Sequence, residues 1–190
     1  MEIITSQNRQ AVVSYHGDIL QIVIPAKKDG FMIFFLSVWL IIWAVAEVAS
    51  PLALIGFKDE GAVIMTILIL WMIIWTVVGF LTMFALLWNI LGREVISVGR
   101  KYLSIKNDVL GYGRWRQYES SQIKALRVSK TKDAWGSLDY TMQCWGLFGG
   151  MLAFEYQNRT YRFGMGIEAS AAREILQRIL HRYTWLAVKR

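Results

Sequence analysis

The chain has 190 residues, a formal net charge of +7 and nine tryptophans, and 55% of its residues are hydrophobic. This hydrophobic share is high for a soluble globular domain and ordinary for a protein that is partly embedded in a membrane. The single cysteine, Cys144, excludes an intrachain disulfide and a cysteine-rich metal site.

Residues 1–30 form a polar leader in which we predict one strand. Residues 19–25 alternate in hydrophobicity and end at Pro25, as a half-buried strand does. The leader lacks an apolar core followed by a small-residue cleavage site, so we expect no cleaved secretory signal. This strand is expected to pair with the sheet of the downstream domain, which would fix that domain beneath its own membrane anchor.

Residues 31–91 predict a hairpin of two transmembrane helices. The first apolar stretch runs from residue 31 to residue 50 and is expected to stop at Pro51. The second, residues 61–91, contains no charged side chain. As a helix it would be roughly 46 Å long, which exceeds the ~30 Å hydrocarbon core of a bilayer.

The basic residues that flank the two stretches predict the topology. Short loops rich in lysine and arginine stay in the cytoplasm. Lys27 and Lys28 precede the first stretch, and Arg93, Arg100 and Lys101 follow the second, whereas the only base in the connecting loop of residues 51–60 is Lys58. We therefore expect a two-pass protein of the bacterial inner membrane with both termini in the cytoplasm. Residues 93–190 contain 17 Lys or Arg against 8 Asp or Glu, so the cytoplasmic part is basic.

Two tryptophan pairs occupy the apolar stretches, each with the i, i+4 spacing that places both rings on one side of a helix. The pairs are Trp39 with Trp43 and Trp71 with Trp75. The two ridges either pack on each other within the hairpin or face the lipid and dock the span of a partner protein. Glu47 is the only charge in the first stretch, and we expect its side chain to reach towards water at the outer interface.

Residues 92–190 predict a mainly β domain that ends in an α-helix. Seven short segments alternate between apolar and polar residues. The expected strands cover residues 94–99, 101–110, 114–120, 123–130, 139–146, 151–157 and 159–164. In the last pair, Leu152, Phe154 and Tyr156 share one face and Tyr161 and Phe163 oppose them. From residue 168 to residue 183 the apolar positions follow a helical period instead.

Seven strands and a closing C-terminal helix form the element order of a pleckstrin-homology-like (PH-like) domain. The whole chain resembles bacterial membrane-anchored proteins in which a two-helix hairpin precedes such a domain, and the resemblance implies a β sandwich or barrel closed by the helix. The layout is also similar to the photosystem I assembly protein of cyanobacteria and chloroplasts, above all over residues 92–128. Both resemblances imply binding or assembly and no chemistry.

Several bases and one tryptophan of the cytoplasmic domain are candidates for binding anionic lipid headgroups. They are Arg93, Arg100, Lys101, Arg114, Trp115 and Arg116. Trp115 could insert at the membrane interface while its flanking arginines meet phosphates. The alternative is an ordinary solvated surface beside a packed tryptophan.

The sequence offers no support for catalysis, a cofactor, a metal or a nucleic-acid partner. Its two histidines, His16 and His181, have no carboxylate at ligand spacing, and no nucleophile motif is present. Residues 164–166, Gly-Met-Gly, are the nearest approach to a phosphate loop, but a strand-to-helix turn accounts for them. The bases are scattered and form no recognition helix.

We therefore expect a non-enzymatic accessory, scaffold or assembly subunit that binds another integral membrane protein or complex through its hairpin and its basic domain. A homo-oligomer is also compatible with the sequence. The alternatives are a module that binds anionic lipid headgroups, and an enzyme or transporter component whose site is not recognised.

Overall fold

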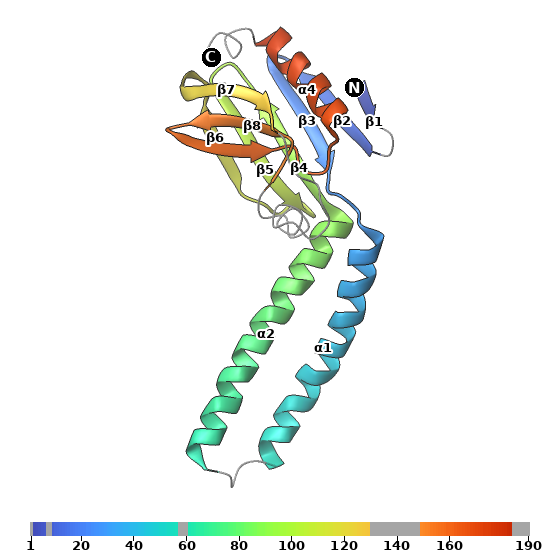
Figure 1. Cartoon of the computed structure of the whole chain (residues 1–190), viewed down its shortest axis with the longest axis vertical. Coiled ribbons are helices and arrows are strands. Elements are labelled where there is room, and N and C mark those ends of the chain that lie inside the picture. The colour runs from blue at the N-terminus through green and yellow to red at the C-terminus, as the bar shows by residue number, and fades with distance from the viewer. Residues whose placement is uncertain (1, 7–8, 57–60, 130–148, 184–190) are drawn as a thin grey trace. The chain divides into compact units, whose positions relative to one another are not determined.

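A computed structural model of the chain describes residues 2–6, 9–56, 61–129 and 149–183 (Figure 1). The chain divides into two compact units. Residues 28–87 form the hairpin unit, and residues 1–27 together with residues 88–190 form the β unit. The β unit is therefore discontinuous in sequence, whereas the sequence-based division set the leader apart from the C-terminal domain.

The larger sheet of the β unit is an antiparallel meander of six strands in the order of the chain. Its strands are β1 (Glu2–Ser6), β2 (Arg9–His16), β3 (Ile19–Pro25), β4 (Gly92–Val98), β5 (Tyr102–Val109) and β6 (Trp115–Glu119). β3 occupies the residues predicted for the leader strand, but β1 and β2 were not predicted. Ala11 and Val13 of β2 are buried. Two alternating apolar positions are too few for the sequence pattern alone to indicate a strand.

In the sequence, the hairpin unit lies between β3 and β4, two strands that pair directly with each other in this sheet. β3 pairs with β4 in antiparallel register from Leu20 opposite Val98 to Pro25 opposite Arg93. One more hydrogen bond, from the Ala26 amide to the Gly92 carbonyl at 2.9 Å, continues the ladder. The predicted pairing of the leader strand with the downstream sheet is thus confirmed.

A second, three-stranded sheet contains β7 (Ile123–Val128), β8 (Leu152–Tyr156) and β9 (Arg159–Phe163). A short 3₁₀ helix, Ser120–Gln122, leads from β6 into β7. Leu152 lies opposite Phe163 and Phe154 opposite Tyr161, which confirms the predicted hairpin. Gln157 and Asn158, both with positive φ, form its two-residue turn.

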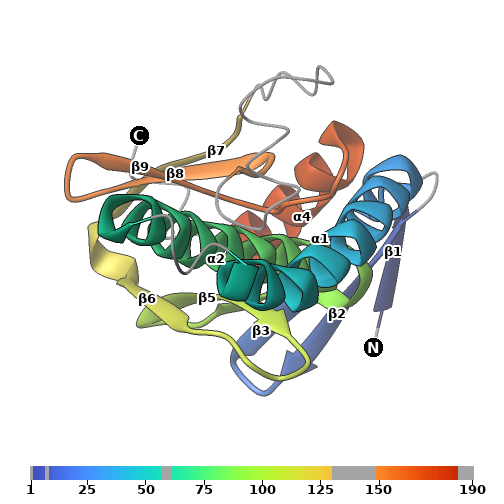
Figure 2. The same ribbon diagram turned by 90° about the horizontal axis from the view of Figure 1, so that it is seen from below.

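The helix α4 (Ala169–Arg182) follows β9 and matches the predicted C-terminal helix. Its apolar stripe is buried in the β unit, and the Tyr183 hydroxyl lies within hydrogen-bonding distance of the carbonyls of Val98 (2.8 Å) and Asp18. Figure 2 shows the two sheets as separate layers of the β unit. The resemblance implies a sandwich or a barrel closed by the helix. Within the described residues the two sheets stay open, so a closed barrel is not observed. The predicted strand at residues 139–146 lies outside the described part of the chain.

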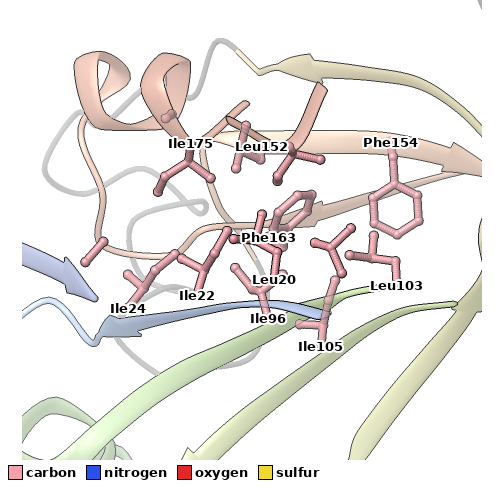
Figure 3. Close-up of a cluster of buried hydrophobic side chains, with 14 of the residues drawn as sticks. Leu20, Ile22, Ile24, Ile96, Leu103, Ile105, Leu152, Phe154, Phe163 and Ile175 are labelled. Atoms are coloured by element: carbon pink, nitrogen blue, oxygen red, sulfur yellow. The ribbon is translucent and has the colours of Figure 1, made fainter. Parts of the chain in front are cut away.

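One hydrophobic core joins the two sheets and α4. Figure 3 shows the labelled side chains of both sheets directed towards each other, with Ile175 of α4 among them. The fully buried members include Leu20, Ile22, Ile24, Ile96, Leu152, Phe154, Phe163, Ile175 and Ile179. Strands from both sides of the hairpin insertion therefore contribute to the same core, which makes residues 1–27 an integral part of the β unit.

The hairpin unit consists of α1 (Gly30–Gly56) and α2 (Ala62–Leu91), the last residues of which belong to the β unit. Both helices are long and apolar enough to cross a membrane. Asp29 caps α1 by accepting a hydrogen bond from the Met32 amide at 3.1 Å. The expected stop at Pro51 is wrong, because α1 continues through it to Gly56. The Glu47 carbonyl, four residues before the proline, instead accepts a hydrogen bond from the Ser50 hydroxyl at 3.2 Å.

Candidate functional site

One cavity of the β unit has a volume of about 1020 Å³, and its described lining residues come from both sheets. Four of its described lining residues are arginines, and one is a carboxylic acid. The arginines are Arg114, Arg116, Arg127 and Arg162, and the acid is Glu94. A positively charged cavity of this size is suited to a small anionic ligand.

The alternation of β6 separates Trp115 from Arg116, two of the three neighbouring residues that the sequence grouped together. Arg116 lies opposite Ile105, whereas Trp115 lies opposite Lys106. Directly opposed residues point to the same face of a sheet, so Arg116 shares the face of the core residue Ile105 and Trp115 takes the other face. The Lys106 ammonium lies 5.9 Å from the centre of the Trp115 ring. Trp115 therefore packs beside a cation, although it also borders the cavity.

Arg93, another candidate base, pairs with a buried acid on this other face. Its Nε lies 2.6 Å from Oδ2 of Asp108, and Nζ of Lys106 lies 2.7 Å from Oδ1. The Asp108 side chain is only 2% exposed. Hydrogen bonds from Lys106 and then from Arg93 hold the pKa of Asp108 below its ordinary value of 3.8, against the opposing effect of burial. Arg93 and Lys106 thus neutralise an internal charge.

Arg100 and Lys101 lie in the turn between β4 and β5 and do not line the cavity. Nη2 of Arg100 is 3.3 Å from Oδ2 of Asp18, and both side chains are largely exposed. Lys101 is exposed as well. Of the six headgroup candidates, Arg114, Trp115 and Arg116 border the cavity, and Arg93, Arg100 and Lys101 do not.

Glu94 occupies the phosphate-loop-like turn that the sequence singled out. Its Oε2 accepts hydrogen bonds from the amides of Gly164 (2.8 Å) and Met165 (2.7 Å). Burial raises the pKa of Glu94 from 4.5 to about 7, and the two amide hydrogen bonds limit this rise. The turn at residues 164–166 thus binds a carboxyl group that the chain itself supplies, and this contact connects β4 to the segment before α4.

Sequence reasoning missed Arg127 and Arg162, which reach the cavity from the smaller sheet. Arg127 lies opposite Ala153, and Ala153 lies opposite Arg162, so the three form one row across β7, β8 and β9. Arg127 donates to Oε1 of Glu155 at 2.9 Å. No local motif marks this row, because its members are brought together only by strand pairing.

The tryptophan pairs of the hairpin unit partly pack on each other. The indole of Trp43 donates a hydrogen bond to the Trp75 carbonyl at 3.2 Å, and the rings of Trp39 and Trp75 are 5.7 Å apart. A Cβ on Gly79 would lie 1.9 Å from the Trp43 ring, so the absence of a side chain at Gly79 makes room for the indole. Trp71 stacks on Trp75 at 5.2 Å and is 49% exposed within the described structure.

Glu47 joins this helix contact. Its Oε1 lies 2.6 Å from the Thr76 hydroxyl of α2, and the same hydroxyl is 2.9 Å from the Met72 carbonyl. The carboxyl group therefore contacts the neighbouring helix. The sequence led us to expect only that the Glu47 side chain reaches towards water. A polar contact of this kind between apolar helices typically contributes about 1 kcal/mol in a membrane.

Comparisons of the chain with protein-family models, with curated proteins and with solved structures find no match.

Proposed function

We propose that this chain is a two-pass integral membrane protein that acts as a non-enzymatic accessory, scaffold or assembly subunit for another membrane protein. In this proposal α1 and α2 span the bacterial inner membrane and the β unit lies in the cytoplasm. The bases at the sheet ends of the spans, Lys27, Lys28 and Arg93, favour that orientation, since arginine and lysine are retained on the cytoplasmic side.

We further infer that the β unit is PH-like. β3 to β6 supply four antiparallel strands, β7 to β9 supply three, and α4 follows them. These make seven strands, the number that the resemblance implies. β3 is the first of them, and the predicted strand at residues 139–146 is not counted. β1 and β2 would then be additions that extend the first sheet.

The observation that carries the accessory role is the insertion of the spans between two paired strands. α2 ends at Leu91 and β4 begins at Gly92, so no linker separates them. On the other side only residues 26–29 separate β3 from α1. Two such short connections keep the β unit near its anchor, and that proximity suits a subunit that acts on a neighbouring membrane protein.

The hairpin supplies a candidate docking surface within the membrane. Trp39, Trp43 and Trp75 contact one another or the neighbouring helix, whereas Trp71 leaves half of its surface outside those contacts. Large aromatic side chains contribute disproportionately to protein interfaces. We therefore place the partner span against the side of α2 that bears Trp71.

The test is purification of the tagged full chain in mild detergent, followed by mass spectrometry of the proteins bound to it. The proposal expects an integral membrane protein in defined stoichiometry, and it expects Trp71→Ala to lower its recovery. Ile73→Ala is the matched control, because Ile73 is equally exposed two residues away. A complex that contains only copies of this chain, or a partner yield that Trp71→Ala leaves unchanged, would contradict the proposal.

A reporter fused after residue 190 tests the orientation separately. Activity of a cytoplasmic reporter agrees with the proposal. Activity of a periplasmic reporter at the same position overturns it, whatever proteins are bound to the hairpin.

A further inference from the structure

The turn between β5 and β6 lies at the end of the larger sheet where α2 enters it. β4 begins at Gly92, directly after α2, and Val109, the last residue of β5, lies opposite Gly92. Neighbouring strands of a sheet are about 4.8 Å apart, so the turn begins one strand spacing from the residue that follows α2. Ile90 and Leu91, the last residues of that helix, belong to the β unit and are exposed. The turn thus lies beside the apolar end of a proposed membrane span.

The tip of this turn is apolar and exposed. Leu110 is 67% exposed. Tyr112 is 84% exposed, more than any large hydrophobic side chain described for α1 or α2. Trp115, where β6 begins, is nearly half exposed as well. Tyrosine and tryptophan are the residues that concentrate at the interface between the hydrocarbon and the headgroups of a bilayer.

The backbone of the turn makes a leucine at its tip unusual. The amide and the carbonyl of Val109 pair with the carbonyl and the amide of Tyr112, both at 2.9 Å. Leu110 and Gly111, between them, have φ values of 52° and 91°. Turns of this kind favour Asn, Asp or Gly, because a left-handed backbone strains other residues. Leu110 therefore combines backbone strain with apolar exposure to water, and burial of its side chain in another phase would offset that cost.

Lys106 holds the turn in place. Its ammonium donates a hydrogen bond to the Gly111 carbonyl at 2.8 Å and lies 5.9 Å from the centre of the Trp115 ring. These contacts connect the tip to the strands on both sides of it. A preorganised tip loses little conformational entropy when Leu110 and Tyr112 become buried, which favours binding.

The position and the chemistry of the turn favour a bilayer as the phase that covers it. The turn is one strand spacing from the residue that follows α2, so in a two-pass protein the bilayer is the nearest apolar phase. Arg114 directly follows the turn and is exposed. An arginine beside an apolar anchor can extend its charge to the level of the lipid phosphates.

We propose that the turn at residues 110–114 inserts into the interface of the bilayer that α2 spans, with Leu110 and Tyr112 as its anchoring side chains and Arg114 at the level of the phosphates. Neither anchoring residue was among the sequence candidates. The proposal rests on the proposed two-pass arrangement. It differs from recognition of a particular headgroup, because burial of apolar side chains requires no particular lipid charge.

The experiment uses the purified full chain in nanodiscs, with Cys144→Ser to remove its only cysteine. Tyr112→Cys, Tyr102→Cys and Ile73→Cys each introduce one site for an environment-sensitive fluorophore. Tyr102 is the control, because it is also about half exposed but lies at the opposite end of β5. Seven residues of strand separate it from Val109, a distance of about 23 Å. Ile73 reports on the span itself.

Lipids that carry a nitroxide on the acyl chain quench a fluorophore that reaches them. Shallow nitroxides are expected to remove about half of the emission or more from position 112, and deep ones from position 73, with little loss at position 102. Loss at position 73 without loss at position 112 overturns this proposal alone. The absence of loss at position 73 overturns the two-pass arrangement, and this proposal with it. Equal loss at positions 112 and 102 overturns the assignment to the turn.

Leu110→Asn tests the anchoring side chain directly. Asparagine favours the backbone of this turn, so the variant is expected to fold while it loses the apolar tip. Quenching at position 112 should fall about twofold or more. Ile19→Asn is the matched control, because Ile19 is exposed at the opposite end of the sheet. Melting temperatures in detergent show that both variants are folded. Quenching that Leu110→Asn leaves unchanged, or that both variants lower equally, argues against insertion of the turn.

Discussion

Pro25 and Arg93 lie directly opposite each other in the paired strands β3 and β4, although both apolar helices separate them in the sequence. The hydrogen-bonded pairing of β3 with β4 therefore continues up to the point where the chain leaves the sheet and returns to it.

Replacing residues 27–91 with an Asn-Gly turn is expected to give a water-soluble β unit. A two-residue turn of this type joins antiparallel neighbours with the twist that the flanking strands require. The measurement is cooperative thermal unfolding, monitored by circular dichroism, of protein purified without detergent. A product that aggregates or unfolds without cooperativity would show that the β unit needs its helices.

Gly79→Ala is expected to destabilise the hairpin unit, although alanine normally stabilises a helix by about 1 kcal/mol relative to glycine. The added Cβ would lie 1.9 Å from Cε2 of Trp43, so the indole must leave its place. Overpacking of this kind costs about 1–3 kcal/mol. Gly30→Ala is the control, since its Cβ would meet no atom within 4 Å. The measurement is the melting temperature in detergent, and an unchanged value for Gly79→Ala would contradict the packing.

The stability of the β unit is expected to fall between pH 4.5 and about 7. The pKa of Glu94 is raised by burial to about 7 in the folded chain, from 4.5. In this interval the folded state binds more protons than the unfolded state, so stability is highest below pH 4.5 and is lost as the pH rises towards 7. The loss from this group amounts to about 3 kcal/mol.

Glu94→Gln separates this effect from other titrations. The glutamine carbonyl can still accept hydrogen bonds from Gly164 and Met165 but cannot ionise. Chemical denaturation of both proteins at several pH values is the measurement. The variant should lack the decline between pH 4.5 and 7, and a decline of equal size in both proteins would assign it to another group.

Asp108→Asn is expected to destabilise the β unit by about 2 kcal/mol, since hydrogen bonds that involve charged groups contribute about 1.5–3 kcal/mol. Asp108 is buried and contacts both Arg93 and Lys106. Its pKa is lowered in the folded chain, so its contribution is present above pH 3.8 and is lost as the pH falls further.

Asp18→Asn is the control for this prediction. Asp18 and Arg100 also form an ion pair, but both side chains are largely exposed, and such pairs contribute little. Denaturant titration should give a midpoint close to that of the unmodified chain. Equal losses for the two substitutions would contradict the role assigned to burial.

The features that depend on local pattern could be predicted from the sequence. The long uncharged stretch predicted α2, and alternation predicted the hairpin in which Leu152 and Phe154 share a face with Tyr161 and Phe163, whereas the register within it comes from the structure. α1 was predicted as well, but its end was not. Pro51 is tolerated inside the helix because a neighbouring serine satisfies the Glu47 carbonyl, and this compensation cannot be recognised before the rotamer is known.

The cavity could be predicted only in part. Arg114 and Arg116 are close in sequence and were candidates, whereas Arg127 and Arg162 reach the same cavity through strand pairing. A bulge in β7 at Ala125 reverses the face on which Arg127 lies, so simple alternation would place it wrongly. Glu94 likewise meets its partners, the amides of residues 164 and 165, only in the folded chain.

The strands of the larger sheet come from both sides of the hairpin unit in the sequence, and this determines the order in which the sheet can form during synthesis. β1, β2 and β3 leave the ribosome first, and their neighbour β4 follows only after both apolar helices have been made. Until then β3 has an unpaired edge, which is prone to associate with other chains. Slow insertion of the helices should therefore expose the nascent chain to aggregation or to chaperones, and the sheet can be completed only after the anchor has been translated.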